Sequence, residues 1–261
     1  YSDKETVKNL TSVDGATVTL YAQWEDTWAN HASSSLKTTE INGVTYNVIA
    51  SAEDLAYLSK QSISSTLVGK YIQTADIDLS EYTWLPIGSE NAFCGEYLGQ
   101  GHKITGLKTS DSVDAEDVYL QTYGGLFGKL GKNDTTGASA NIVGVYITGC
   151  QVYGEYSGAI AGLSDVDSIN IEACILENIE IEGNTTASFV GLSNAGQIKD
   201  CLLISSNIST TDTTTHGFYT GAMTIKSCYF VENNSAIKFT GESSDYSNWI
   251  EDVFMYPLPS I

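Results

Sequence analysis

The sequence is poor in basic residues and in long apolar runs. It has 12 Lys and Arg against 32 Asp and Glu, a formal net charge of −20 and a pI near 4.2. Without a basic run, the chain lacks the positive charge that phosphate backbones attract, so we expect no nucleic-acid partner. No stretch approaches the roughly 18 consecutive apolar residues of a membrane span, so we expect no membrane insertion of this chain.

Ligands for transition metals are also scarce. The chain has three histidines, and its five cysteines include no CxxC pair, so the spacing typical of zinc sites is absent. An odd number of cysteines cannot all pair within one chain, and we interpret three of them as small buried apolar side chains rather than parts of a disulfide framework. We therefore predict no cofactor, with calcium as the one candidate, weighed below.

Long amphipathic helices are missing between Ile142 and Ile237, which argues against leucine-rich, ankyrin and tetratricopeptide repeats. This region instead repeats a short pattern of Ile, two variable residues, Val or Cys, one variable residue and a large apolar residue. The Val or Cys falls at positions 145, 174, 201 and 228, which are 29, 27 and 27 residues apart. A second motif, with Gly or Ala four residues before a Gly, precedes each segment and ends at Gly128, Gly162, Gly191 and Gly221.

The repeated segments alternate apolar and polar residues, as half-buried strands do. We predict an all-β fold, a right-handed parallel β-helix in which each repeat is one coil of two or three short strands. Like residues then stack on like, so Val145, Cys174, Cys201 and Cys228 form one inward column. The three cysteines of this column should resist chemical labelling until the protein unfolds.

Upstream residues extend the pattern. They are Asp76-Ile-Asp-Leu79, Trp84-Leu-Pro-Ile-Gly88, Phe93-Cys-Gly95, Gly101-His-Lys-Ile104 and Gly124-Gly-Leu-Phe-Gly128. In this order they resemble the GLUG-motif β-helix family, over about residues 40 to 235. That family occurs in secreted and surface proteins of bacteria, including adhesins and the N-terminal parts of some immunoglobulin A peptidases. The resemblance implies the fold but no site residues, because the recurring positions are glycines and core apolar residues.

The chain divides into three predicted parts. Thr19-Leu-Tyr-Ala-Gln-Trp24 resembles the closing strand of the InlB B-type (Listeria–Bacteroides) repeat, which implies that residues 1–25 are the C-terminal remnant of a β-grasp-like spacer. Residues 26–37 are expected to be a linker and residues 38–261 the β-helix. Near its start, Ser51 is a suitable N-cap for a short helix over about residues 52–61, which would cover the open end of the core.

Clustered carboxylates suggest one candidate metal site. Asp111, Asp114, Glu116 and Asp117 place four carboxylates in seven residues. Calcium takes oxygen ligands of this kind, but the EF-hand spacing is absent. Two interpretations are open, a calcium site and a solvated acidic loop.

Two further carboxylate pairs lie two residues apart, which places both side chains on one face of a strand. Glu180 and Glu182 belong to a group with Glu172 and Glu177, and could line an acidic groove of a carbohydrate-active enzyme or simply solvate the strand. Asp76 and Asp78 could act as an acid and a base, but we favour a structural role in which they accept hydrogen bonds from backbone N–H groups.

Outward tyrosines suggest a binding surface. Tyr146 and Tyr229 occupy the outward position of the repeated strand, where rings can stack on sugars or anchor a protein partner. We expect a monomeric, non-catalytic adhesin domain that recognises a glycan or a host or bacterial surface protein. The alternatives are a glycosidase or polysaccharide lyase with an acidic groove, and a purely structural stalk.

The location of the protein follows from the resemblance and from the first residues. The GLUG-motif family implies an extracellular protein. Because the chain begins at Tyr1 with neither Met nor a signal peptide, we interpret it as a piece of a longer chain. We expect attachment to the cell wall or cell surface through parts of the protein outside this piece.

Overall fold

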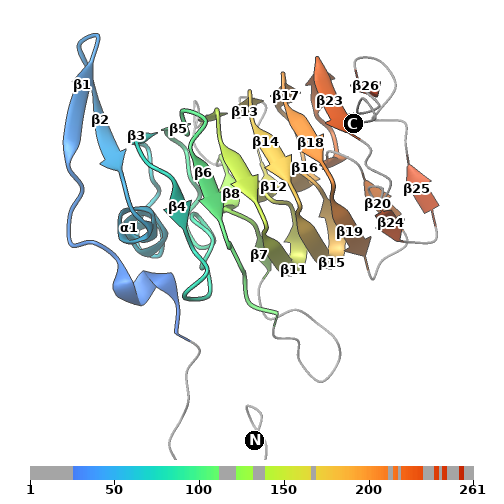
Figure 1. The fold of residues 1–261 in the computed structure, drawn as a ribbon, viewed down its shortest axis with the longest axis horizontal. Helices are drawn as coiled ribbons and strands as arrows, with labels where there is room; N and C mark the ends of the chain where they lie inside the picture. The colour runs from blue at the N-terminus through green and yellow to red at the C-terminus, as the bar shows by residue number, and fades with distance from the viewer. Residues whose placement is uncertain are drawn as a thin grey trace, which may run out of the picture.

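The protein is a parallel β-solenoid of about five turns with one α-helix near its N-terminus (Figure 1). The structure, a computed structural model, describes residues 26–111, 122–131, 139–165, 169–210, 214–216, 219–231, 238–240, 243–245 and 253–255. Residues 1–25, predicted to be a spacer remnant, lie outside the described residues. The predicted fold class, a parallel β-helix with a short N-terminal helix, is confirmed.

Four sheets run along the solenoid, one for each side of the coil. The first sheet comprises β1 (Thr38–Ile41), β2 (Val44–Ile49), β3 (Lys70–Gln73), β5 (Glu96–Leu98), β9 (Ala140–Val143), β13 (Ile169–Glu172), β17 (Gln197–Lys199) and β22 (Thr224–Lys226). The second comprises β4 (Ile77–Asp78), β6 (Lys103–Thr105), β10 (Tyr146–Thr148), β14 (Ile175–Glu177), β18 (Leu202–Ile204), β23 (Cys228–Val231) and β26 (Val253–Met255).

The other two sheets complete the coil. The third comprises β7 (Tyr123–Gly124), β11 (Gln151–Ser157), β15 (Glu180–Ala187), β19 (Asn207–Thr210) and β24 (Lys238–Thr240), with β20 (Thr214–His216) and β25 (Ser243–Asp245) beside them. The fourth comprises β8 (Phe127–Leu130), β12 (Ala161–Ser164), β16 (Val190–Ser193) and β21 (Tyr219–Gly221).

The coil thus has four sides, which corrects the prediction of two or three strands per coil. The additional side comes from the glycine motif, because its second half forms the fourth sheet and Gly162 lies in register with Gly128 and Gly191. A Cβ added to Gly191 would lie 2.4 Å from the backbone nitrogen of Ser157 in the third sheet. Glycine is therefore required at this position, because any side chain would collide with the backbone of the third sheet.

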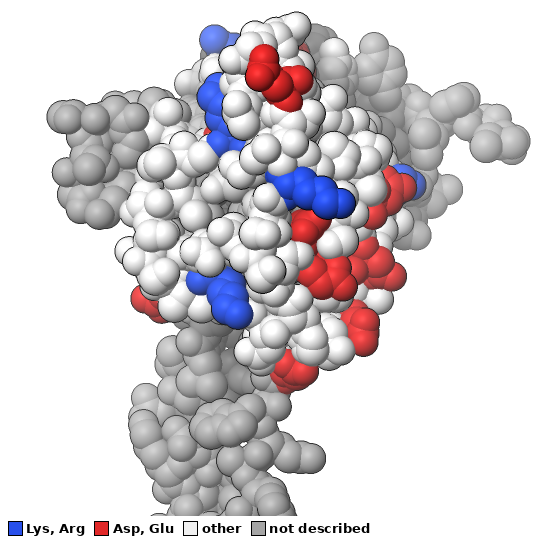
Figure 2. Space-filling view, turned by 90° about the vertical axis from the view of Figure 1, so that its left-hand side faces the viewer, with Lys and Arg blue, Asp and Glu red and all other residues white. Residues whose placement is uncertain are grey.

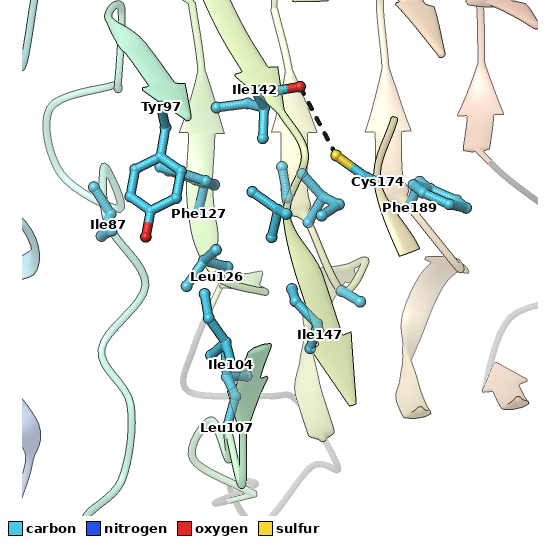
Figure 3. Close-up of a cluster of buried hydrophobic side chains, with 14 of the residues drawn as sticks. Ile87, Tyr97, Ile104, Leu107, Leu126, Phe127, Ile142, Ile147, Cys174 and Phe189 are labelled. Atoms are coloured by element: carbon cyan, nitrogen blue, oxygen red, sulfur yellow. Dashed lines mark hydrogen bonds between the residues drawn. The ribbon is translucent and has the colours of Figure 1, made fainter. Parts of the chain in front are cut away.

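The predicted inward column is confirmed by the register of the second sheet. Tyr146 pairs with Ile175, Ile175 with Leu202 and Leu202 with Tyr229, so the residues just before them stack as well. Cys174, Cys201 and Cys228 are free, fully buried thiols in this stack. Each thiol donates to backbone carbonyls of its own coil or the preceding one, as from Cys174 Sγ to Ile142 O at 3.8 Å (Figure 3).

One continuous apolar core fills the inside of the coils. Its largest fully buried side chains include Trp84, Phe93, Tyr97, Phe127 and Phe189. Figure 3 shows side chains from neighbouring coils pointing into this space from opposite sides. Because a single coil buries its apolar face only against its neighbours, the stack is the stable unit.

The N-terminal end carries the helix α1 (Ala52–Ser62) at the open end of the core (Figure 1). Ser51 caps it as predicted, since its Oγ accepts from the Asp54 N–H at 3.3 Å, and Asp54 Oδ2 accepts from the Ala50 N–H at 3.1 Å. Leu55 and Leu58 of the helix are fully buried in the core.

The first sheet begins with the antiparallel β1–β2 hairpin. Its turn residues Asn42 and Gly43 both have positive φ, as a two-residue hairpin turn requires.

Residues 26–37, predicted to be a linker, contain the short 3₁₀ helix η1 (Trp28–His31). Trp28 is buried, and its indole Nε1–H donates to Leu79 O at 2.9 Å, which ties this segment to the solenoid. The proposed domain boundary at residue 38 stays a prediction. No helix in the described part of the chain is long and apolar enough to cross a membrane.

Candidate ligand-binding groove

The candidate site starts from a bend that recurs in each coil. Between the second and third sheets, one residue per coil adopts the left-handed backbone conformation, with φ between 45° and 66°, and these residues are Gly106, Gly149, Asn178 and Ser205. Glycine and asparagine tolerate this conformation better than other residues, which explains two of the residue types at the bend. Because the coils are in register, the four bends stack into one straight corner.

A groove of about 690 Å³ follows this corner. Three strand spacings of about 4.8 Å separate the four stacked bends, so the groove extends for about 14 Å along the solenoid axis. Its lining repeats from coil to coil and consists of Ser80, Gly106, Leu107, Lys108, Gly149, Cys150, Gln151, Asn178, Ile179, Glu180, Ser205, Ser206 and Asn207. We call it the corner groove.

The floor of the corner groove is formed by the residues that follow each bend. Leu107, Cys150, Ile179 and Ser206 are all buried there, with relative exposures of 4% or less. Burial raises the pKa of Cys150 to about 12, so its thiol is protonated at neutral pH. A protonated thiol is a poor nucleophile, and Cys150 therefore contributes shape rather than reactivity.

The outer wall is the outward face of the third sheet. Its side chains form two rows that cross the strands, one of Gln151, Glu180 and Asn207 and one of Tyr153, Glu182 and Ser209. Gln151 Nε2 donates to Glu180 Oε2 at 2.9 Å. A smaller hollow of about 130 Å³ lies against both rows and shares Glu180 and Asn207 with the corner groove. The predicted residues Glu180 and Glu182 are thus brought together, and both are exposed.

Tyr153 supplies an aromatic ring beside these carboxylates. Its backbone is fixed by Thr109, whose Oγ1 accepts from the Tyr153 N–H at 2.7 Å and donates to Tyr153 O at 2.9 Å. Burial raises the pKa of Tyr153, and the negative charges of Asp111, Glu182 and Glu180 raise it further, while Lys108 opposes them. The ring therefore lies within a group of charged side chains at the smaller hollow, beside the corner groove. The alternation of its strand was visible in the sequence, but the neighbours that single out Tyr153 were not.

The predicted ligand residues Tyr146 and Tyr229 lie on the second sheet, on strands β10 and β23, and not among the residues that line the groove. The Tyr146 hydroxyl donates to Glu177, and this hydrogen bond raises the pKa of Tyr146. Lys103 Nζ lies 5.0 Å from the centre of the Tyr146 ring. The ring thus already has a cationic neighbour, and a role in ligand binding stays a prediction for both tyrosines.

The glutamates that are close in sequence are separated by the fold. Glu172 lies in the first sheet, Glu177 in the second, and Glu180 and Glu182 in the third. Glu172 Oε1 pairs with Lys199 Nζ at 2.9 Å, and hydrogen bonds from Lys199 and Asn170 hold its pKa below the ordinary value. The four carboxylates therefore do not form one site.

The calcium prediction falls partly outside the described residues. Asp114, Glu116 and Asp117 lie there, whereas Asp111 is exposed and pairs with Lys108 at 3.3 Å. Within the described ranges, no group of three or more His, Cys, Asp and Glu side chains could hold a metal ion. The calcium site stays a prediction.

Asp76 and Asp78 have the structural role that we favoured. Asp76 Oδ1 accepts from the Lys103 N–H at 2.9 Å, and Asp78 Oδ1 accepts from the Ser80 N–H at 2.9 Å. These backbone hydrogen bonds are the main reason that the pKa of each carboxyl lies below its ordinary value.

Comparison with known proteins adds little beyond the fold. No family model matches the sequence, and no curated protein matches it either. One similar solved structure is described as a putative immunoglobulin A1 protease from Bacteroides ovatus. The two chains are 16% identical with a TM-score of 0.45, and the similarity covers 81% of this chain and 83% of that one. This similarity concerns the course of the backbone and carries no argument about activity.

Proposed function

We propose that this chain is a non-catalytic binding module of a bacterial surface protein and that it holds a linear glycan along the corner groove. The observation that carries the proposal is the repetition of the groove. Hydroxyl, amide and carboxylate side chains recur at equivalent positions of successive coils, at Gln151, Glu180 and Asn207 and at Asn178 and Ser205. A polymer of repeating units matches a surface whose hydrogen-bonding groups also repeat.

The chemistry of the lining favours a sugar over an apolar ligand. Amide and hydroxyl side chains both donate and accept hydrogen bonds, as sugar hydroxyls do. Tyr153 in the smaller hollow beside the groove offers an aromatic ring on which a pyranose can stack. The resemblance of the glycine and core motifs to GLUG-motif β-helices supports a location at the cell surface, where glycans are accessible.

The exposure of the two glutamates favours binding over catalysis. A glycosidase needs one carboxyl group whose pKa is raised by desolvation, so that it can donate a proton near neutral pH. Glu180 and Glu182 are both exposed to solvent, and neither lies in the apolar surroundings that such an acid requires. An enzyme with an acidic groove remains the second candidate, since two carboxylates on one strand face line the smaller hollow.

A glycan array followed by calorimetry tests the proposal. Wild-type protein should retain a subset of linear glycans, and Tyr153→Ala should weaken their binding by up to about tenfold, because stacking on one aromatic ring is worth about 0.5–1.5 kcal/mol. Tyr46→Ala is the matched control, since it removes another half-buried tyrosine but from the first sheet, where it lines neither hollow. Equal weakening by both substitutions would reject the corner groove.

The same samples separate the alternatives. Prolonged incubation with each bound glycan, followed by chromatography, should yield no cleavage product. A product that disappears in Glu180→Gln or Glu182→Gln would establish the enzyme instead. No retained glycan at all would leave the structural stalk or a protein receptor.

A further inference from the structure

The charge balance of the corner groove indicates what kind of glycan it selects. Among the described residues that line the groove and the smaller hollow, Lys108 carries the only positive charge, and its ammonium pairs with Asp111 at 3.3 Å. Glu180 and Glu182 bring two negative charges. The net charge of the site is therefore negative, because Asp111 neutralises the ammonium of Lys108 and the two glutamates add their own negative charges.

The two carboxylates are arranged along the direction of the third-sheet strand. They lie on the same outward face of β15, with one residue between them, so their Cα atoms are about 6.7 Å apart. Gln151 occupies one oxygen of Glu180, and an ionised carboxylate has room for several more donors. The corner groove runs along the solenoid axis, across the strands, so the two carboxylates lie side by side in one coil and can both accept hydrogen bonds from the same unit of a ligand.

The charge of the rest of the molecule has the same sign as the charge of the groove. The formal charge of the whole chain is −20, so the long-range field attracts cations and repels anions. Seen from the N-terminal end, acidic side chains gather along one side of the solenoid, and the basic ones are dispersed (Figure 2). Glycans that carry uronate or sulfate groups are therefore expected to be repelled, both by the charge of the whole chain and by the glutamates at the groove.

We propose that the corner groove, together with the smaller hollow beside it, selects linear glycans that carry free, protonated amino groups, that is, amino-sugar polymers without N-acetyl groups. Each ammonium donates charge-assisted hydrogen bonds to Glu180 or Glu182, while the sugar hydroxyls bond to the amide side chains beside them. This inference rests on the proposed function and adds the chemical class of the ligand.

Three probe oligosaccharides of equal length test the selection by calorimetry at mildly acidic pH, at which the sugar amines are protonated. They are a fully deacetylated glucosamine oligomer, its fully N-acetylated counterpart and a galacturonate oligomer. The free-amine oligomer should bind at least about tenfold more tightly than the acetylated one, and the galacturonate oligomer should not bind detectably. Raising the salt concentration should reduce this preference because exposed charges are screened.

A double variant assigns the preference to the groove. The double variant Glu180→Gln, Glu182→Gln should bind the free-amine and acetylated oligomers equally, because both negative charges are removed. The shape of the two side chains is nearly preserved, so a change in packing does not explain the result. Glu40→Gln is the matched control, since Glu40 is an exposed glutamate of β1 at the far end of the first sheet, and the preference should persist there. Melting curves of all variants establish that each is folded.

The outcomes separate this inference from the proposed function. Equal affinity of the wild type for the free-amine and acetylated oligomers would overturn the selection and leave glycan binding intact. A preference that survives in the double variant, or that Glu40→Gln also removes, would overturn the role of the groove carboxylates. Absence of binding to every glycan of the array would overturn both proposals.

Discussion

The two corners that flank the second sheet have the same backbone conformation but different surroundings. At the corner with the first sheet the left-handed residues are Gly144, Ala173, Asp200 and Ser227, with φ between 50° and 66°. At the corner with the third sheet they are Gly106, Gly149, Asn178 and Ser205, with φ between 45° and 66°. In both, the residue after each bend points inward and is buried, as Cys174 and Ile179 show in one coil.

The difference lies in the side chains beside the bend. At the first corner Lys199 pairs with Glu172 at 2.9 Å and with Asp200 at 3.2 Å, so opposite charges lie together. At the second corner the neighbours are Gln151, Glu180 and Asn207, and the surface is hollowed. The bend itself therefore shapes the coil in the same way at both corners, whereas the flanking side chains differ and form ion pairs at one corner and line a hollow at the other.

The largest effect is expected from the buried residues behind the corners. Ile179→Ala should lower the free energy of unfolding by about 2–4 kcal/mol, because it removes a branched side chain from a packed core and leaves a cavity. Cys174→Ala, at the equivalent place behind the first corner, should cost about 1 kcal/mol, because a single sulfur atom is lost. Denaturant titration monitored by circular dichroism measures both. Equal losses would mean that the size of the removed side chain does not set the cost at these two positions.

A smaller effect is expected from the bends themselves. Gly149→Ala should lower the free energy of unfolding by about 1 kcal/mol, since alanine disfavours the left-handed conformation. A Cβ at Gly149 would have no atom within 4 Å, so the cost is conformational and not steric. Ala173→Gly, the reverse change at the first corner, should be stabilising by about 0.5 kcal/mol, because the relief of strain exceeds the added entropy of the unfolded chain. Destabilisation by Ala173→Gly would show that the alanine methyl group makes favourable contacts.

The smallest effect concerns the ion pair of the first corner. The pKa of Glu172 in the folded protein lies below its ordinary value of 4.5, chiefly because Lys199 donates a hydrogen bond to it. The pair therefore stabilises the folded state above about pH 4.5, and this contribution is lost as the pH falls through the lower, folded-state pKa.

The expected size of this contribution is small because the pair is partly exposed. Wild type and Glu172→Gln should differ by less than about 0.5 kcal/mol at pH 7 and converge at acid pH. Thermal melts of both proteins across the acid range measure the difference. A difference that does not depend on pH would assign it to packing rather than to charge.

Much of the fold could be predicted from local pattern. The spacing of Val145, Cys174, Cys201 and Cys228 indicated stacked coils, and Ser51 with Asp54 indicated the start of α1. These predictions succeed because strand alternation and helix capping depend on residues a few positions apart. The number of sides per coil was not predicted, because the glycine motif does not reveal how many bends the chain makes between two equivalent strands.

The candidate site was less predictable than the fold. Glu180 and Glu182 were singled out because residues two apart on a strand share a face. The sequence does not distinguish Tyr153, which lines the smaller hollow, from the other tyrosines, because its neighbours Asp111 and Lys108 are more than 40 positions away in the sequence. Glu172 and Glu177 were grouped with the groove glutamates, since nothing in the sequence shows that a corner separates each from the next.

The sequence by itself determined which residues of the repeated strands point inward and that the repeats stack as coils. That information lies in a repeat with a regular spacing, and each coil carries its own copy of it. Only the tertiary structure decided which outward side chains meet, because the register between coils brings together residues that are 27 to 43 positions apart, such as Tyr146 with Ile175 and with Lys103. A binding surface made of such neighbours exists only once the coils are stacked.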